Sequence, residues 1–377
     1  MAVASDLGYV RKAEEPVLPP PRSEFGAVAW VRDNLFSSTT NTILTLLGIA
    51  FIAWSVPPIL RWTFIDAVWA GDDRTACLAP EAGACWAFVK AKFNQFLYGR
   101  YPFDQRWRVD LVTVLLVAGL IPMAIPRVPF KRENVIYLLV VFPILSYILL
   151  LGGMLGLRYV ETSLWGGLLV TLVVAIVGIV ASVPLGILLA LGRRSQLPVV
   201  RVFSISFIEF VRGVPLITVL FMASVMLPIF LPPGVSFDKF LRALIGVALF
   251  AAAYMAEVVR GGLQAIPKGQ YEAASALGLN YWRMMGLIVL PQALKIVIPG
   301  IVNSFISLFK DTSLVLIIGI YDLLGIVQLG FADPNWVTPR TPATGYVFAA
   351  IVFWLFCFSM SRYSIYTERR LSTGHAR

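Results

Sequence analysis

Two long apolar segments flank the polar stretch Glu257-Val-Val-Arg260-Gly-Gly-Leu-Gln-Ala-Ile-Pro267-Lys268-Gly269-Gln270-Tyr-Glu272-Ala273-Ala274-Ser-Ala-Leu277-Gly278-Leu279, which runs on to Gln292. Its middle predicts a short helix, because Gly269-Gln270 can begin one and Gly278 can end it. Glu272 is expected in the first turn, where the helix dipole favours negative charge. The small side chains of residues 273–276 would let another backbone approach closely. The stretch therefore predicts a short helix that a soluble partner moves as a lever. The alternative is an amphipathic helix that lies on the lipid headgroups.

The composition is that of a membrane protein. Apolar residues make up 58% of the chain and charged residues 14%, whereas a soluble domain is about 25% charged. A helical span needs about 20 apolar residues, and a membrane barrel would instead show weakly alternating segments of about 10 residues. We therefore predict an all-α integral membrane protein with eight transmembrane helices. These are Asn41–Leu60, Val109–Ile125, Val135–Leu151, Leu164–Leu191, Val214–Leu231, Leu241–Val259, Ile296–Ile320 and Gly345–Phe358.

Lysine and arginine are distributed unevenly about these spans. With the N-terminus in the cytoplasm, most of them fall in cytoplasmic segments, and the short outer loops and their edges hold only Arg158, Lys239, Arg242 and Arg340. Because cytoplasmic loops carry an excess of basic residues, both termini and the polar stretch are predicted to be cytoplasmic. The net charge of +10 follows from the same bias and does not call for a nucleic-acid partner.

The predicted spans divide the chain into four regions. A polar, partly disordered cytoplasmic tail covers residues 1–40 and lacks the apolar core of a cleavable signal peptide, so the first span is expected to remain as an anchor. A three-helix extension covers 41–157, with a long periplasmic loop at 61–108. The core covers 158–366, with the polar stretch as a cytoplasmic loop at 260–292, and a second cytoplasmic tail covers 367–377.

The long outer loop contains two of the three cysteines, Cys77 and Cys85. Pro80 and Gly83 between them would let the chain turn back, and an oxidising periplasm would permit a disulfide; two free thiols are the alternative. The loop continues with aromatic and basic residues mixed from Trp86 to Phe103, which predicts an interfacial helix.

The sequence contains no catalytic or metal-binding pattern. Its only histidine is His375, which excludes a multi-histidine metal site and argues against a histidine-based triad. The phosphate-binding loop of an ATPase is also absent, because no Gly-Lys dipeptide occurs. If ATP drives this protein, a separate chain must bind the nucleotide.

Glu272-Ala273-Ala274 followed by Gly278 resembles the "EAA" coupling loop of permease subunits in ATP-binding-cassette importers. The flanking segments Ala256–Gly261 and Pro267–Gln270 resemble the polar amino acid branch of that family. The likeness covers about residues 160 to 370, and the first 160 residues match only the longer M-type permeases of bacterial general L-amino-acid (Aap/Bzt-like) uptake systems. It implies that the following residues couple the chain to an ATPase: Gln270, Tyr271, Glu272, Ala273, Ala274, Ala276, Leu277, Gly278 and Leu279.

This resemblance implies a non-enzymatic permease subunit in the bacterial inner membrane. Its partners would be a second permease in a heterodimer, two ATPase subunits that bind ATP and Mg²⁺, and a periplasmic binding protein that delivers an L-amino acid. Two other classes stay open, an ion- or proton-coupled secondary carrier and a structural membrane scaffold. A carrier commonly shows inverted repeats with matching broken helices, whereas this sequence shows only a brief Glu-x-x-Arg-Gly repeat.

That repeat occurs as Glu209–Arg212–Gly213 and Glu257–Arg260–Gly261, near the cytoplasmic ends of neighbouring spans. A charge at the bilayer centre costs about 2.5–3.5 kcal/mol, so membrane charges usually pair or face a cavity. A spacing of three places each acid and base on one helical face, where they are expected to pair. We interpret the four charges as a polar inner rim or gate, and snorkelling with local ion pairs is the alternative.

A second candidate segment lies deeper, and its candidate path residues are Asn303, Ser307, Lys310, Asp311, Thr312 and Ser313. Lys310 and Asp311 cannot both point inward from a regular helix. The last three residues are helix-capping types, so a broken or restarted helix is predicted here, beside protein or a water-filled path. Lys310, Asp311 and the freed backbone would complement the carboxylate and ammonium of an amino acid. The alternative is a structural ion pair or helix cap.

Overall fold

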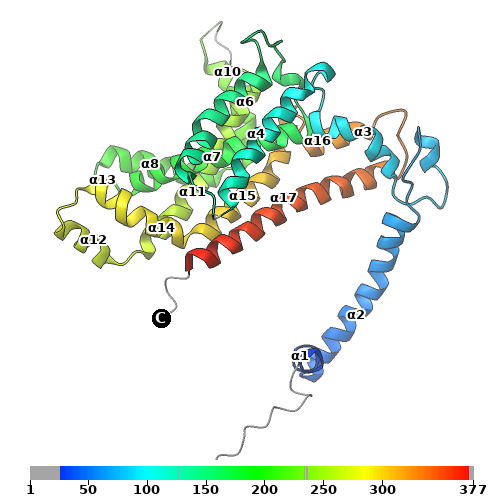
Figure 1. Cartoon of the computed structure of the whole chain (residues 1–377), viewed down its shortest axis with the longest axis horizontal. Helices are drawn as coiled ribbons and strands as arrows, with labels where there is room; N and C mark the ends of the chain where they lie inside the picture. Colours follow the sequence, from blue (N-terminus) through cyan, green and yellow to red (C-terminus); the bar gives the residue numbers. More distant parts are fainter. Residues whose placement is uncertain (1–25, 126, 233, 235–236, 373–377) are drawn as a thin grey trace, which may run out of the picture. The chain divides into compact units, whose positions relative to one another are not determined.

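The computed structural model describes residues 26–125, 127–232, 234 and 237–372. Within these ranges all regular secondary structure is helical, apart from two isolated bridges, Val68 with Cys85 and Gly167 with Asp322 (Figure 1). The α-helices are α1 Gly26–Leu35, α2 Thr39–Leu60, α3 Trp86–Tyr98, α4 Arg106–Ala124, α5 Lys131–Ile136, α6 Phe142–Leu151, α7 Gly167–Arg193, α8 Pro198–Gly213, α9 Leu216–Phe221, α10 Leu227–Phe230, α11 Lys239–Ala265, α12 Lys268–Ala276, α13 Tyr281–Met284, α14 Leu290–Ile296, α15 Ile298–Asp311, α16 Leu323–Gly330 and α17 Thr341–Ser372. The short 3₁₀ or π segments are η2 Arg61–Ile65, η3 Arg74–Cys77, η4 Phe103–Gln105, η5 Tyr137–Val141, η6 Thr162–Leu164, η7 Met222–Met226, η8 Met285–Val289 and η9 Thr312–Ile318. The predicted all-α class is confirmed.

The chain divides into two compact units, one ending at Ala67 and one beginning at Val68. The described part of the first unit contains α1, α2 and η2. Ser38 caps α2 by accepting a hydrogen bond from the backbone N–H of Asn41 at 3.2 Å. Residues 26–35 of the predicted disordered tail are helical, and the rest of that prediction, with the run Pro19–Pro21, lies outside the described residues.

The number of spans agrees with the prediction. Seven helical segments of the described chain are long and apolar enough to cross a membrane, and the count reaches eight if one bent pair forms a single span. They are Thr39–Ile65, Phe103–Ala124, Lys131–Leu151, Gly167–Arg193, Lys239–Ala265, Ile298–Ile318 and Thr341–Leu371, with the bent pair Pro198–Gly213 and Leu216–Phe230. The last helix is longer than the predicted Gly345–Phe358, so residues 367–372 of the predicted tail are helical.

The fifth predicted span, Val214–Leu231, is not one straight helix. It is divided into α9, η7 and α10, and α8 before it is bent away by 106°. The bend lies at Gly213–Pro215, where the sequence indicates a loosened helix: proline has no backbone N–H to donate and restricts the residue before it to extended geometry.

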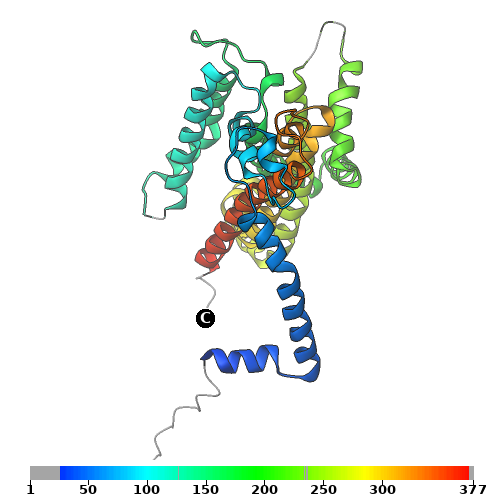
Figure 2. The same cartoon turned by 90° about the vertical axis from the view of Figure 1, so that its right-hand side faces the viewer.

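The second unit is built around the crossing of α7 and α11, which form its most extensive helix contact. Glycine allows the close approach, since a Cβ added at Gly186 would lie 2.7 Å from the Met255 Cβ. Small residues at such crossings are typical of membrane helices, where packing rather than the hydrophobic effect holds helices together. Helix α15 packs against both α7 and α11, and α17 lies beside α15 (Figures 1 and 2).

Helix α3 forms where the sequence predicts a helix, but two of its aromatic residues face the protein interior. Phe88 and Phe96 are fully buried, with ring centroids 5.6 Å apart, and they pack among residues of α16 and α17. The prediction of an interfacial helix is therefore wrong for these two side chains. Burying an aromatic ring against other helices removes more apolar surface from water than laying it on a headgroup region.

Cys77 and Cys85 form a disulfide in the loop before α3, with their Cα atoms 5.7 Å apart. This loop and α3 are both attached to the segment between α16 and α17. The Arg74 backbone N–H donates to the Asn335 carbonyl at 2.7 Å, and Lys92 forms an ion pair with Asp333. That ion pair holds the pKa of Asp333 below its usual value. In Figure 1, α3 and α16 lie at one end of the second unit and α12 and α13 at the other.

Candidate functional site

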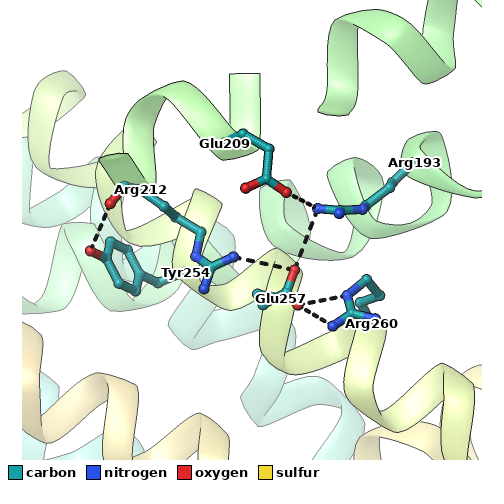
Figure 3. Close-up of polar contacts among 6 residues, drawn as sticks. All are labelled: Arg193, Glu209, Arg212, Tyr254, Glu257 and Arg260. Carbon is teal, nitrogen blue, oxygen red and sulfur yellow. Dashed lines mark hydrogen bonds and ion pairs between the residues drawn. The ribbon is translucent and has the colours of Figure 1, made fainter. Parts of the chain in front are cut away.

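Glu257 lies at the centre of a cluster of ion pairs at the ends of three helices (Figure 3). On its own helix, α11, it accepts a hydrogen bond from Arg260 Nε at 2.7 Å. Its Oε2 lies 3.5 Å from Arg193 Nη1 of α7 and 3.5 Å from Arg212 Nη1 of α8. Arg193 also donates to Glu209 of α8 at 2.7 Å. We call these five residues the ion-pair cluster.

The pairing within the cluster differs from the prediction in one respect. Glu257 and Arg260 pair as their spacing predicts, but Glu209 and Arg212 do not pair with each other. Helix α8 packs against both α7 and α11, so its acid meets Arg193 and its base meets Glu257. The Arg212 guanidinium also lies over the Tyr254 ring, 5.8 Å from its centroid, and this contact directs it toward α11.

The sequence did not indicate Arg193 as a site residue. It contributes there only to the count of basic residues, yet in the structure it joins α7 to both acids of the cluster. One local signal was available: Arg193 and Arg194 end a long apolar helix, where a cation is favoured by the helix dipole.

A cavity of about 410 Å³ lies between α7, α11 and α15. This volume falls within the range of about 300–1,000 Å³ that is typical of small-molecule sites. The following residues line it: Ser182, Phe250, Ala251, Tyr254, Met255, Asn303, Ser304, Phe305, Ile306, Ser307, Leu308, Lys310 and Asp311. Four of the six predicted path residues are among them.

Lys310 and Asp311 line this cavity together, contrary to the argument that they cannot both point inward. The cavity follows a broad arc of α15 from Asn303 to Asp311 rather than a single stripe, so neighbouring positions both border it. The cavity wall therefore contains an ammonium, a carboxylate, an amide and hydroxyl groups.

Thr312 and Ser313 are placed differently. The Thr312 hydroxyl donates to the Phe309 carbonyl at 2.8 Å, and the Ser313 hydroxyl donates to the Lys310 carbonyl at 2.9 Å. The predicted break does not occur here, because α15 continues directly into the 3₁₀ segment η9. The side chains of these two residues satisfy the carbonyls of the preceding turn instead of capping a new helix.

The predicted coupling helix is α12. It begins at Lys268, so Glu272 lies beyond the first turn, and the predicted dipole interaction is wrong. Its end agrees with the prediction: Gly278 has φ +71°, the Leu279 N–H donates to the Ala274 carbonyl, and the Gly278 N–H donates to the Ser275 carbonyl. These two bonds form a Schellman motif, which needs a left-handed residue at the position of Gly278.

The two faces of α12 have different surroundings. The Ala274 side chain is buried within the second unit, and the Tyr271 side chain is half-buried. Glu272, Ala273, Ala276 and Leu277 are exposed, and Leu277 retains 76% of its surface. Gln270 accepts a hydrogen bond from Gln292 Nε2 at 3.1 Å, which connects α12 to α14. The exposed face therefore presents three apolar side chains and one carboxylate.

The part of the chain that the structure describes contains no group of three or more His, Cys, Asp or Glu side chains that could hold a metal ion. Its most perturbed acid outside the spans is the N-cap of α16. There, Asp322 Oδ1 accepts from the Gly325 N–H at 2.9 Å, and burial raises the pKa of this carboxyl to about 6.

Comparison with known proteins places these features in a family. A family model described as the binding-protein-dependent transport system inner membrane component matches residues 182–373. The chain belongs to this family. It is 54% identical to the inner membrane amino-acid ABC transporter permease protein YhdY of Escherichia coli (strain K12), over 95% of this chain and 97% of that protein.

A second relative is the glutamate/glutamine/aspartate/asparagine transport system permease protein BztC of Rhodobacter capsulatus, at 42% identity over 98% of this chain and 100% of that protein. A solved amino acid ABC transporter with histidines has 28% identity and a TM-score of 0.47, covering 54% of this chain and 92% of that chain. The chain is thus the inner-membrane permease subunit of an ABC importer and not itself an enzyme. This membership disfavours the secondary carrier and the scaffold.

Proposed function

We propose that this permease carries L-amino acids into the cytoplasm as one half of a heterodimer. Its partners would be a second, shorter permease, two ATPase subunits that bind ATP and Mg²⁺, and a periplasmic binding protein that delivers the amino acid. The names of YhdY and BztC support amino acids as the substrate class, and the acids and amides in the name of BztC suggest which ones to test first.

The observation that carries this proposal is the cavity between α7, α11 and α15. A free amino acid has a carboxylate and an ammonium, and the cavity wall offers Lys310 and Asp311 as charges of the opposite sign. Asn303 and Ser307 add hydrogen-bonding groups on the same side of α15. Charged side chains that face a cavity are a typical sign of a membrane transport path.

The ion-pair cluster would act as a gate in this path. It joins α8 to α7 and α11, two of the helices that line the cavity. ATP binding would draw the ATPases together and move α12, and the permease halves would open outward to receive the amino acid. Hydrolysis would then restore the inward state.

The positive-inside bias supports an orientation with both termini in the cytoplasm. The ion-pair cluster and α12 then lie on the cytoplasmic side, where the ATPases bind. The disulfide-bonded loop before α3 lies in the oxidising periplasm. A cysteine introduced at exposed Ser275 should be labelled by an impermeant thiol reagent only after the inner face is opened. Labelling from the periplasm of intact cells would reject this orientation.

Uptake by the reconstituted complex tests the proposal. We expect ATP-dependent uptake of L-glutamate, L-glutamine, L-aspartate or L-asparagine in proteoliposomes that contain the binding protein, and loss of uptake in Glu272→Ala and Gly278→Pro. Gln264→Ala, at an exposed position in the last turn of α11, serves as the control. Uptake that needs an ion gradient but no ATPase subunit would refute an ATP-driven importer.

Neutral variants of the cavity test the path separately. Lys310→Met and Asp311→Asn should change the order of preference among these amino acids or reduce their uptake. Lys295→Met, at an exposed lysine of α14 outside the cavity lining, should behave as the parent does. An unchanged preference order in both cavity variants would mean that the substrate does not touch these side chains.

A further inference from the structure

Two adjacent arginines at the end of α7 contact two different parts of the molecule. Arg193 belongs to the ion-pair cluster, through Glu209 and Glu257. Arg194 is the C-cap of the same helix, and its Nη1 donates to the Tyr271 hydroxyl of α12 at 3.1 Å. The end of α7 therefore lies between the cluster and α12.

The contact with Tyr271 has three members. Arg194 Nη1 also donates to the Leu263 carbonyl at 3.3 Å, and the Tyr271 hydroxyl donates to the same carbonyl at 3.3 Å. The guanidinium lies over the Tyr271 ring, 5.6 Å from its centroid. Leu263 lies in the last turn of α11, where backbone carbonyls lack partners within the helix. The Tyr271 side chain thus joins the ends of α7 and α11 to α12.

The C-terminal parts of α7 and α11 also contain the residues at the centre of the ion-pair cluster. Arg193 comes directly before Arg194, and Glu257 lies on α11, less than two turns before Leu263. A displacement of α12 that moves Tyr271 would therefore pull on α7 and α11 at once, next to the contact between Arg193 and Glu257. The path consists of the hydrogen bonds of Tyr271 and Arg194, the backbone of α7 and α11, and the ion pairs of Arg193 and Glu257, which are the kinds of contact that can carry coupling between two sites.

We infer that Arg194 and Tyr271 are positioning residues that transmit movement of α12 to the ion-pair cluster. This inference rests on the proposed ATP-driven import. The alternative is a contact that only holds the 260–292 loop in place. A holding contact would affect how much complex assembles, whereas a transmitting contact sets how much transport each hydrolysed ATP produces.

The test is the ratio of ATP hydrolysed to amino acid imported, measured per assembled complex in proteoliposomes with loaded binding protein. Tyr271→Phe keeps the ring but removes the hydroxyl, and Arg194→Gln removes the charge. We expect each to raise the ratio by about tenfold, the scale of losing a hydrogen bond to a charged group. The double variant should be no worse than either single variant, because both remove one shared contact.

Two controls complete the design. Arg194→Lys keeps a cationic donor and should restore most of the coupling. Arg201→Gln, at an exposed arginine of α8, should match the parent. If the parent complex shows no ATP-driven uptake, the proposed function itself fails. If the parent transports and both single variants keep its ratio, even with reduced assembly, the contact only holds the loop and the inference is overturned.

Discussion

Replacing Glu257 by glutamine is the sharpest test of the ion-pair cluster. The change keeps the shape of the side chain but removes the carboxylate that three arginines share. Arg193 retains Glu209 as a partner, whereas Arg212 and Arg260 lose the acid with which they pair. The variant therefore leaves two guanidinium groups uncompensated where three helices meet.

The size of the effect follows from distance and exposure. Two unit charges 3.5 Å apart attract by about 5 kcal/mol at an effective dielectric constant near 20. The Glu257 side chain is 22% exposed and the three arginines around it are 26–34% exposed, and solvent screening reduces each pair to about 1 kcal/mol. Two lost pairs then lower the free energy of unfolding by about 2 kcal/mol, which for a chain of 377 residues corresponds to a melting temperature about 2.5 °C lower.

The assay is thermal unfolding of the purified complex in nanodiscs, with uptake measured on the same preparations. Glu209→Gln is the matched control, since this acid is 54% exposed and pairs with Arg193. We expect it to lower the melting temperature by about 1 °C. Equal decreases in melting temperature for the two variants would show that the pairing of Glu257 with three arginines adds no stability, and would refute the reasoning.

Two further predictions concern stability. Folding raises the pKa of Asp322 from 3.8 to about 6, so the folded chain holds this proton more tightly than the unfolded chain between those values. The free energy of unfolding should therefore fall as pH rises from about 4 to about 6, by about 3 kcal/mol, and then level off. Asp322→Asn should flatten this part of the melting profile, and identical profiles for parent and variant would contradict the assignment. Gly278→Ala meets no neighbouring atom within 4 Å but must keep φ +71°, so it should cost about 1 kcal/mol, seen as reduced helical protection of α12 in hydrogen exchange. Unchanged exchange rates across α12 would mean that the left-handed turn is not needed to end the helix.

The helix end at Gly278 and the helix break near Pro215 could be predicted because each depends on a few neighbouring residues. A left-handed turn needs glycine, and a proline lacks the donor that a helix requires. The start of α12 was misplaced by one residue, since several polar residues before Glu272 can begin a helix equally well. The aromatic side chains of α3 were misplaced for a different reason: the helices that cover Phe88 and Phe96 come more than 200 residues later in the chain.

The sequence by itself therefore determined local features. These are the apolar segments that are long enough to cross a bilayer, the helix α12, and the charged residues near the membrane that need an ion-pair partner. Only the tertiary structure decided which partners those charges have. Glu209 faces Arg193 instead of the neighbouring Arg212, and Arg194 reaches Tyr271, because α7, α8 and α11 end at the same place. An ion pair depends on the distance between two side chains in space, and packing brings together residues whose separation along the chain carries no such information.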